Sequence, residues 1–283
     1  MKREVISSRS NTLVREARAV REGKERAFIF IEGVRLCEEA LRSSLPVVDV
    51  LYTEKLEREA RGAQLLAELS RTARRIVAVS EDVFSSVSDT KTPQGIVALA
   101  PRPPTDRSVL DARAGETPLV VLLHRVNNPS NAGAMLRVAE AAGANAVITT
   151  EGSTDIFSAK ALRGAMGSSF RLPVWTGASF GDALAWCRER EIQTVATDLR
   201  AADAHTGIDW TQPRAIIVGA EASGLEAVET YAADASIRIP MRPPVESLNV
   251  ALALAVVLYE ADRQRKSESP KSKVQSPKPA DRS

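Results

Sequence analysis

The first hundred residues alternate short apolar runs with amphipathic segments. The runs at 27–31, 47–53, 75–80 and 95–100 are rich in Val, Ile and Phe, as buried strands are. Between them, VRLCEEALRS and LEREARGAQLLAELSR repeat apolar side chains every three or four positions, which is typical of amphipathic helices. The pattern predicts a small α/β domain over residues 1–100.

A second alternating series begins at residue 118. It predicts strands at 119–123, 146–150, 171–175, 193–197, 215–220 and 236–241, and helices at 131–142, 158–164, 179–191 and 247–264. Such alternation is typical of a mostly parallel sheet covered by helices on both faces. The fold class is therefore α/β, with a second domain over residues 118–265.

Two segments lack this periodicity. Residues 101–117 are rich in proline, which disfavours helix in the residue before it, so we expect a linker there. Residues 266–283 have no apolar pattern and several basic side chains, which predicts a disordered basic tail.

The net charge of +2 is unevenly distributed. Residues 263–283 contain seven Lys/Arg and two Asp/Glu, a local +5, so residues 1–262 carry 2 − 5 = −3. Residues 1–26 contain eight Lys/Arg and four Glu, a local +4. One interpretation is that a polyanion binds at this N-terminal end. The alternative is that these residues form a solvated helix face on which Glu and Arg pair at helical spacing.

Several classes of protein are excluded. The longest apolar run, 250–258, is far shorter than the roughly 20 residues of a membrane-spanning helix, and the charged N-terminus lacks the features of a secretory signal. We therefore expect a cytoplasmic protein without a membrane segment. Cys37 and Cys187 are far apart, and with only His124 and His205 no metal-ligand spacing exists, so neither zinc nor a disulfide is expected.

Three loops that leave predicted strands carry candidate chemistry, because ligands bind beyond the carboxyl ends of parallel strands. The first, 124–137, contains the stretch Asn-Asn-Pro-Ser-Asn-Ala-Gly, whose residue types are explained by turn formation alone. Turn formation does not explain Arg137. The second, 216–225, has Gly219 and Gly224 but no Walker Lys-Ser/Thr, and no GxGxxG follows any strand. A nucleoside triphosphate or Rossmann cofactor site is therefore disfavoured.

The third loop, 239–260, leads from a strand through a proline-rich turn into an apolar helix. Ser247 is its candidate N-cap. The helix is apolar around most of its circumference, which indicates burial against another subunit as well as against its own sheet.

Together these loops resemble the three signature motifs of the SpoU (TrmH-like) family of SPOUT RNA methyltransferases. NNPSNAGAMLRVAEAAGANAVI resembles the first motif, IIVGAEASGL the second and IPMRPPVESLNVALALAVVLYE the third, and SAKALRGAMGSSFRLPV is similar to the segment between motifs. SSRSNTLVREAR, FIFIEGVRLCEEAL and TPQGIVALA resemble the ribosomal-protein-like substrate-binding domain that many members carry. The resemblance covers nearly the whole periodic part of the chain.

The resemblance implies a SPOUT-type domain with a C-terminal trefoil knot, which general rules of chain topology would not suggest. It implies S-adenosyl-L-methionine as cofactor, RNA as substrate, a homodimer formed through the C-terminal domain, and no metal. The cofactor-binding positions would be Gly219, Ala220, Glu221, Ile239, Met241, Leu248 and Asn249. The catalytic positions would be Arg137, Asn131, Glu221, Ser247 and Asn249.

The expected function is therefore methyl transfer from S-adenosylmethionine to a ribose 2′-hydroxyl, with ribosomal RNA as the leading substrate. A tRNA 2′-O-methyltransferase and an enzyme of antibiotic resistance acting on one rRNA nucleotide are alternatives within the same class. A non-catalytic RNA-binding assembly protein on the same fold is the rival outside it, and the joint presence of Arg137, Glu221, Ser247 and Asn249 argues against that rival.

Overall fold

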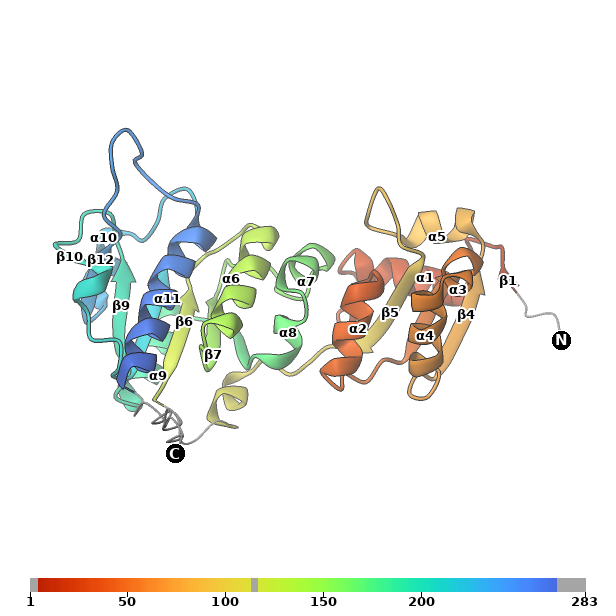
Figure 1. Cartoon of the computed structure of the whole chain (residues 1–283), viewed down its shortest axis with the longest axis horizontal. Helices are drawn as coiled ribbons and strands as arrows, with labels where there is room; N and C mark the ends of the chain where they lie inside the picture. Colours follow the sequence, from red (N-terminus) through yellow and green to blue (C-terminus); the bar gives the residue numbers. More distant parts are fainter. Residues whose placement is uncertain (1–4, 113–116, 269–283) are drawn as a thin grey trace, which may run out of the picture.

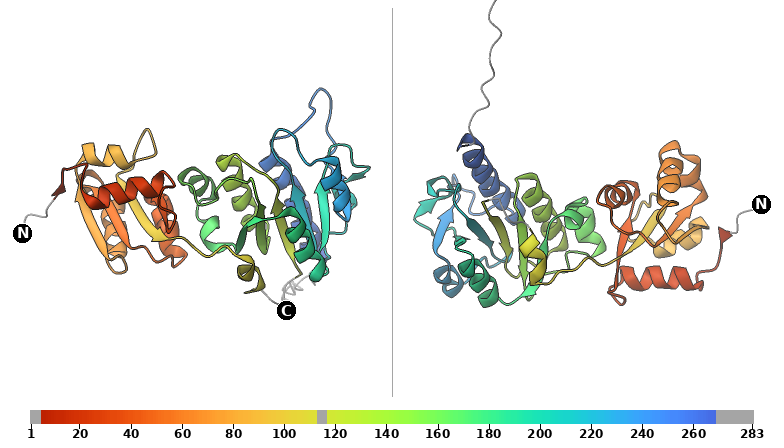
Figure 2. Two further views of the ribbon diagram at one scale, coloured as in Figure 1. Left: turned by 180° about the vertical axis from the view of Figure 1, so that it is seen from behind. Right: turned by 90° about the horizontal axis from the view of Figure 1, so that it is seen from below.

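The structure, a computed structural model, describes residues 5–112 and 117–268. It has two α/β units side by side along the longest axis of the molecule (Figure 1). We call residues 5–101 the N-terminal unit and residues 119–268 the C-terminal unit. Each contains one sheet with helices on its faces, as the views from behind and below also show (Figure 2).

The N-terminal unit has a mixed five-stranded sheet of order β1-β4-β3-β5-β2, in which β5 runs antiparallel to β2 and β3. Its strands are β1 (Val5–Ile6), β2 (Phe28–Glu32), β3 (Asp49–Thr53), β4 (Arg75–Val79) and β5 (Ile96–Pro101). Its helices are α1 (Thr12–Arg21), α2 (Val34–Arg42), α3 (Glu54–Arg58), α4 (Ala60–Leu69) and α5 (Glu81–Val87).

The segment LEREARGAQLLAELSR, expected to form one helix, forms two. The chain is extended at Glu59, between α3 and α4, with φ −82° and ψ 130°. The break lets α4 fold back over α3, where a Cβ on Gly62 would lie only 2.2 Å from the Leu56 carbonyl oxygen. The prediction of a single helix was wrong because the periodicity continues through this turn.

The C-terminal unit has a seven-stranded sheet of order β10-β12-β9-β11-β6-β7-β8, and every pairing in it is parallel. Its strands are β6 (Leu119–Leu123), β7 (Ala146–Thr150), β8 (Val174–Ala178), β9 (Gln193–Thr197), β10 (Asp203–Ala204), β11 (Arg214–Val218) and β12 (Ala235–Arg238). Its helices are α6 (Pro129–Ala141), α7 (Ala159–Ala165), α8 (Ser168–Arg171), α9 (Phe180–Glu189), α10 (Ala227–Ala232) and α11 (Val250–Glu268), with a 3-10 turn η2 (His205–Gly207).

The parallel sheet is buried on both faces, as its unbroken apolar strands predict. Leu119, Val121 and Leu123 pack in the core under α6 and α11, whereas Val120 and Leu122 pack in a second core with α9. Side chains of successive strand residues point to opposite faces, so one apolar run supplies both cores. The prediction of a parallel sheet with two helical layers is confirmed.

Several expected boundaries are corrected by the structure. Residues 168–171 form α8 and strand β8 begins at Val174, because Pro173 has no N–H to give a strand ladder. The last helix begins at Val250 and not at 247, and it continues through residues 266–268, which were expected to be disordered. The rest of the expected tail, 269–283, lies outside the described residues.

The segment expected to be a linker is partly structured. Pro101 is the last residue of β5, and a 3-10 helix η1 (Arg107–Ala112) follows it. Leu110 of η1 is buried in the core beneath α9. The connection therefore belongs in part to the packing of the C-terminal unit.

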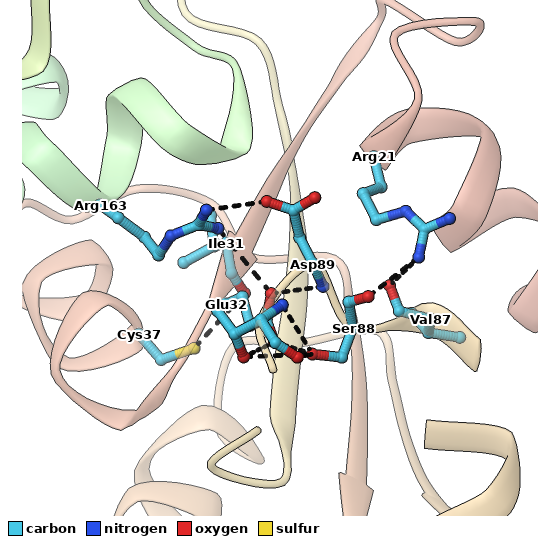
Figure 3. Close-up of polar contacts among 9 residues, drawn as sticks. Arg21, Ile31, Glu32, Cys37, Val87, Ser88, Asp89 and Arg163 are labelled. Carbon is cyan, nitrogen blue, oxygen red and sulfur yellow. Dashed lines mark hydrogen bonds and ion pairs between the residues drawn. The ribbon is translucent and has the colours of Figure 1, made fainter. Parts of the chain in front are cut away.

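The two units are joined by ion pairs around a buried carboxylate. Glu32, at the end of β2, is 5% exposed and accepts hydrogen bonds from the Asp89 N–H (2.9 Å) and the Thr90 hydroxyl (2.9 Å), and from the Ser88 hydroxyl. Figure 3 shows Arg163 reaching from α7 to this cluster, where its Nη2 lies 2.8 Å from Asp89 Oδ2. The segment after α5 therefore contacts β2 of the N-terminal unit and α7 of the C-terminal unit.

Among residues 5–112 and 117–268, no helix is long and apolar enough to cross a membrane. Cys37 and Cys187 are buried free thiols on α2 and α9.

Candidate functional site

A cavity of about 580 Å³ lies beyond the carboxyl ends of β9, β11 and β12. Its lining comes from the strand ends and the loops that follow them, at 197–200, 218–225, 237–239, 241, 246–248, 250, 253–254 and 257. The volume is within the usual range for small-molecule sites, roughly 300–1,000 Å³. The position is the one that an open parallel sheet offers to a ligand.

The loop after β11 turns back on itself at the wall of this cavity. A Cβ on Gly219 would lie 2.3 Å from the Gly224 carbonyl carbon and 2.6 Å from the Leu225 nitrogen. The Gly224 N–H donates to the Ala220 carbonyl at 2.9 Å, and Gly224 has φ +65°. Only glycine allows this close approach at 219, so the backbone of the loop is held open toward the cavity.

Glu221 joins this loop to the start of α6. Its carboxylate accepts hydrogen bonds from the backbone N–H groups of Asn127 (3.3 Å) and Asn128 (3.1 Å), and from Asn131 Nδ2 (3.2 Å). Burial acts to raise the pKa of Glu221, but hydrogen bonds from its own N–H, from Asn131 and from Asn128 together hold it below the usual value. The carboxylate is therefore ionised at neutral pH and acts as an anchor.

Asn249 adds a third segment to the same cluster. Its Nδ2 donates to Asn131 Oδ1 at 3.3 Å, while its Oδ1 accepts from the Ala251 N–H at 2.9 Å. Asn249 is thus the N-cap of α11, and the expectation that Ser247 caps this helix was wrong. The Asn131–Glu221–Asn249 cluster brings together three loops that are up to 118 residues apart in the chain.

Six of the seven expected cofactor-binding residues line the cavity, and Ser247 lines it as well. The six are Gly219, Ala220, Glu221, Ile239, Met241 and Leu248. Asn249 is the seventh, and it lies next to the lining, hydrogen-bonded to Asn131. Their roles stay predictions, but the fold does bring these positions to one place.

Arg137 lies elsewhere. It is an exposed residue six positions after Asn131 on α6, and it lines a second cavity between α6, α8 and α2. Within residues 5–112 and 117–268, its side chain has no hydrogen-bond or ion-pair partner. In a single chain, then, the expected catalytic arginine does not face the cavity that holds the other site residues.

The loop after β9 contributes residues that were not among the predicted site positions. Thr197, Asp198 and Arg200 line the cavity, and Asp198 Oδ1 accepts from the Arg200 N–H at 2.9 Å. A signal for them was present, because they follow an apolar strand of a parallel sheet. They are polar and have no recognisable motif, so their position became apparent only from the strand order.

The buried pair His124–Glu229 lies next to the loop after β11. His124, which follows β6, is 3% exposed; its Nε2 lies 2.8 Å from Glu229 Oε1 and its Nδ1 lies 3.0 Å from Thr150 Oγ1. Glu229 also accepts from the Glu226 N–H at 2.8 Å, which fixes the start of α10 directly after the loop. Among the residues described, no group of three or more His, Cys, Asp or Glu side chains is placed to hold a metal ion.

Comparison with known proteins agrees with this arrangement. The SpoU rRNA Methylase family matches residues 118–259, and the MRM3-like substrate binding domain matches residues 11–98. A relative in Bacillus subtilis (strain 168), named 23S rRNA (guanosine(2553)-2'-O)-methyltransferase RlmP, is 33% identical over 90% of this chain and 97% of its own length. A 23S rRNA (uridine(2479)-2'-O)-methyltransferase of Streptomyces viridochromogenes is 31% identical over 83% of this chain and 82% of its own.

Solved structures share the whole architecture. A crystal structure of an RNA 2'-O ribose methyltransferase superposes with a TM-score of 0.80 at 33% identity, covering 93% of this chain and 100% of that chain. The SpoU methyltransferase AviRb from Streptomyces viridochromogenes, in complex with AdoMet, has a TM-score of 0.81 at 29% identity, covering 91% of this chain and 99% of its own. With both halves matched and the site loops in place, the chain belongs to the SpoU rRNA methylase family.

Proposed function

We propose that this protein transfers a methyl group from S-adenosylmethionine to a ribose 2′-hydroxyl of ribosomal RNA. The observation that carries the proposal is the Asn131–Glu221–Asn249 cluster at the edge of the cavity, which joins the three motif loops by side-chain hydrogen bonds. The curated relatives named above are 23S rRNA 2'-O-methyltransferases. A ribosomal RNA substrate also favours the cytoplasm as the site of action.

The cavity fits a cofactor of this kind. Its lining combines apolar side chains, including Ile239, Met241 and Leu248, with polar ones, and the tight loop at Gly219 forms part of its wall. When bound, the cofactor supplies an electrophilic methyl group on a sulfonium. We propose that these residues hold it mainly through backbone contacts, and that the loops around them form the trefoil knot typical of the family.

We propose that Arg137 acts at the reacting ribose as a cation. An arginine side chain has a pKa of about 12.5–13.8 in solution, so a neutral guanidine at pH 7 lies about 7–9 kcal/mol uphill. A charged guanidinium instead donates hydrogen bonds to the attacking oxygen and to a neighbouring phosphate, and stabilises negative charge as it develops. Glu221 is a weak base because its carboxylate already accepts several hydrogen bonds.

Arg137 requires a second copy of the chain to reach such a site. α6 and α11 lie side by side (Figure 1), and the outer face of α11 exposes Leu252 (62%), Val256 (39%) and Tyr259 (52%) at helical spacing. We propose that this stripe is the surface of a homodimer, through which Arg137 of one copy approaches the cavity of the other. A large exposed apolar stripe is typical of such an interface.

The dimer is tested by sedimentation. Leu252→Glu combined with Val256→Lys should give a monomer, whereas Val228→Glu, at a position 69% exposed on α10, should leave the dimer intact. A wild-type chain that sediments as a monomer contradicts the interface.

The activity is tested by incubating the full chain with radiolabelled S-adenosylmethionine and separate transcripts of 23S rRNA, 16S rRNA and tRNA, then mapping 2′-O-methyl groups by primer extension. We expect label on a ribose of 23S rRNA. Label in tRNA alone would assign the enzyme to the other substrate class. Cofactor binding without transfer to any RNA would favour the assembly protein.

A further inference from the structure

The second cavity, about 600 Å³, lies between the two units and shares no lining residue with the cavity beyond β9, β11 and β12. Its walls are α2 and the start of α4 on one side and α6 and α8 on the other, helices that lie next to each other in Figure 1. Its lining includes five arginines: Arg35, Arg42, Arg61, Arg137 and Arg171. We call it the arginine cleft.

The carboxylates of the arginine cleft are already paired. Glu38 accepts from Arg61 Nε (2.7 Å) and Nη2 (2.6 Å). Glu140 accepts from Arg171 Nε (2.5 Å) and Nη2 (2.9 Å).

Glu39 completes the set. It lies 2.6 Å from Arg42 Nη1 and 2.7 Å from Arg171 Nη1. The three glutamates therefore neutralise three of the five arginines of the lining, which leaves a surplus of two positive charges.

The surplus resides on Arg35 and Arg137. Both are exposed, and within the described ranges 5–112 and 117–268 neither donates a hydrogen bond or lies at ion-pair distance from a carboxylate, although the charge of Arg35 helps to lower the pKa of Glu38. Arg35 belongs to the N-terminal unit and Arg137 to the C-terminal unit, so two free guanidiniums border one cavity from opposite walls. A guanidinium presents a planar set of donors that matches the oxygens of a phosphate.

We propose that the arginine cleft binds the phosphodiester backbone of the substrate RNA, with Arg35 contacting a phosphate that flanks the target nucleotide. The inference rests on the proposed function, since it takes the RNA as substrate and Arg137 as the residue next to the reacting ribose. The strand would pass from Arg137 along α6 into the cleft toward Arg35. Arg35 is then a positioning residue that fixes the RNA between the two units.

The two walls of the cleft are linked by one side chain. Arg171 of α8 bonds Glu39 of α2 and Glu140 of α6 at once, so it holds both walls of the cleft. A cleft whose walls are fixed before binding loses less freedom when the RNA enters. Arg171 therefore maintains the shape of the cleft, whereas Arg35 and Arg137 supply its surplus positive charge.

The test compares two exposed arginines of the N-terminal unit. Arg35→Gln removes a free guanidinium inside the cleft, and Arg71→Gln removes one with equal formal charge beyond the end of α4, outside it. Affinity for a fluorescent 23S rRNA fragment is measured by anisotropy from about 50 to 200 mM KCl, because one lost phosphate contact lowers the salt slope by about one. Thermal melting and calorimetry with S-adenosylmethionine confirm that both variants fold and bind cofactor.

We expect Arg35→Gln to weaken RNA binding about 3- to 10-fold at low salt and to lower the salt slope by about one, with Arg71→Gln close to wild type. Equal behaviour of the two variants, whether both weaken or neither does, overturns the arginine cleft as an RNA site. RNA binding is measured separately from methylation. A wild-type chain that binds RNA without methylating it therefore contradicts only the proposed function. The comparison of Arg35→Gln with Arg71→Gln still shows whether the arginine cleft binds RNA.

Discussion

Asn249 hydrogen-bonds Asn131 with one end of its amide and caps α11 with the other. The Nδ2 of Asn249 lies 3.3 Å from Asn131 Oδ1, and its Oδ1 lies 2.9 Å from the Ala251 nitrogen. The start of the last helix and the cluster at the site are thus set by a single side chain. Because the two contacts use different atoms of one amide, a substitution can remove one contact and keep the other.

Asn249→Asp should separate the two duties. Aspartate is as good an N-cap as asparagine but cannot donate to Asn131, so the melting temperature should stay close to wild type while the transfer rate falls. Asn249→Ala should lose the cap as well, at about 1 kcal/mol of unfolding free energy. Thermal melts and single-turnover methylation of RNA provide the two measurements. Full activity in Asn249→Asp would show that the amide contact to Asn131 is dispensable.

Arg137→Ala should lower the single-turnover methylation rate by about 10²-fold or more at saturating RNA. Cofactor affinity measured by calorimetry should hardly change, because we propose that Arg137 contacts the ribose and phosphate of the RNA and does not hold the cofactor. Arg137→Lys keeps the charge but loses the planar donor pair, so it should not restore the rate if Arg137 is a bidentate cation. Recovery of Arg137→Lys at high pH would instead indicate that the side chain is the base.

Gly219→Ala should weaken cofactor binding strongly. Its Cβ would meet the Gly224 backbone at 2.3 Å, so the loop after β11 has to open and the cavity wall moves. The matched control is Gly207→Ala, where a Cβ meets nothing within 4 Å and φ is ordinary. Calorimetric titration with S-adenosylmethionine measures both, and equal affinities in the two variants would contradict the role of the fold at Gly219.

Asp49 should make the N-terminal unit sensitive to acid. It is 3% exposed, and hydrogen bonds from Arg75 (2.6 Å and 2.9 Å) hold its pKa below the usual value. A lowered folded-state pKa stabilises the fold above the unfolded value of about 3.9, and this stability is lost as pH falls through the folded value. Asp49→Asn should therefore unfold more easily at pH 7, by about 2 kcal/mol, and show a shallower loss below pH 4.

The control for Asp49→Asn is Asp82→Asn, which removes an exposed carboxylate paired with Arg9. Exposed pairs contribute about 0–1 kcal/mol, so urea unfolding of Asp82→Asn should match wild type at both pH values. A parallel pH dependence for Asp49→Asn and wild type would show that this carboxylate does not titrate with folding.

The sequence alone predicted six of the seven strands of the C-terminal sheet and their parallel arrangement, but it predicted neither the two-residue β10 nor the strand order. Runs such as 119–123 and 215–218 are apolar at every position, which requires burial on both faces and hence helices on either side of parallel strands. The three loops after these strands could be identified for the same reason. Their residue types, together with the family resemblance, indicated seven expected cofactor-binding positions, and six of these line one cavity.

Pairing within the N-terminal sheet could not be predicted from the pattern. The antiparallel position of β5 between β2 and β3 depends on which strand ends meet after folding, and an apolar run is the same in either direction. The break between α3 and α4 is likewise a tertiary event. It depends on Gly62 packing against the Leu56 carbonyl, not on a break in periodicity.

The expected site residues of α6 lie in two different places, which the sequence did not indicate. Asn131 and Arg137 belong to one motif, but two residues six positions apart on an α-helix point about 120° apart around its axis. Asn131 therefore faces Glu221 while Arg137 faces the arginine cleft. The sequence determined which residue types lie on α6. Only the packing of α6 between α11, α7 and the sheet decided which of them reaches the cavity of its own chain, because helix rotation is fixed by the buried face.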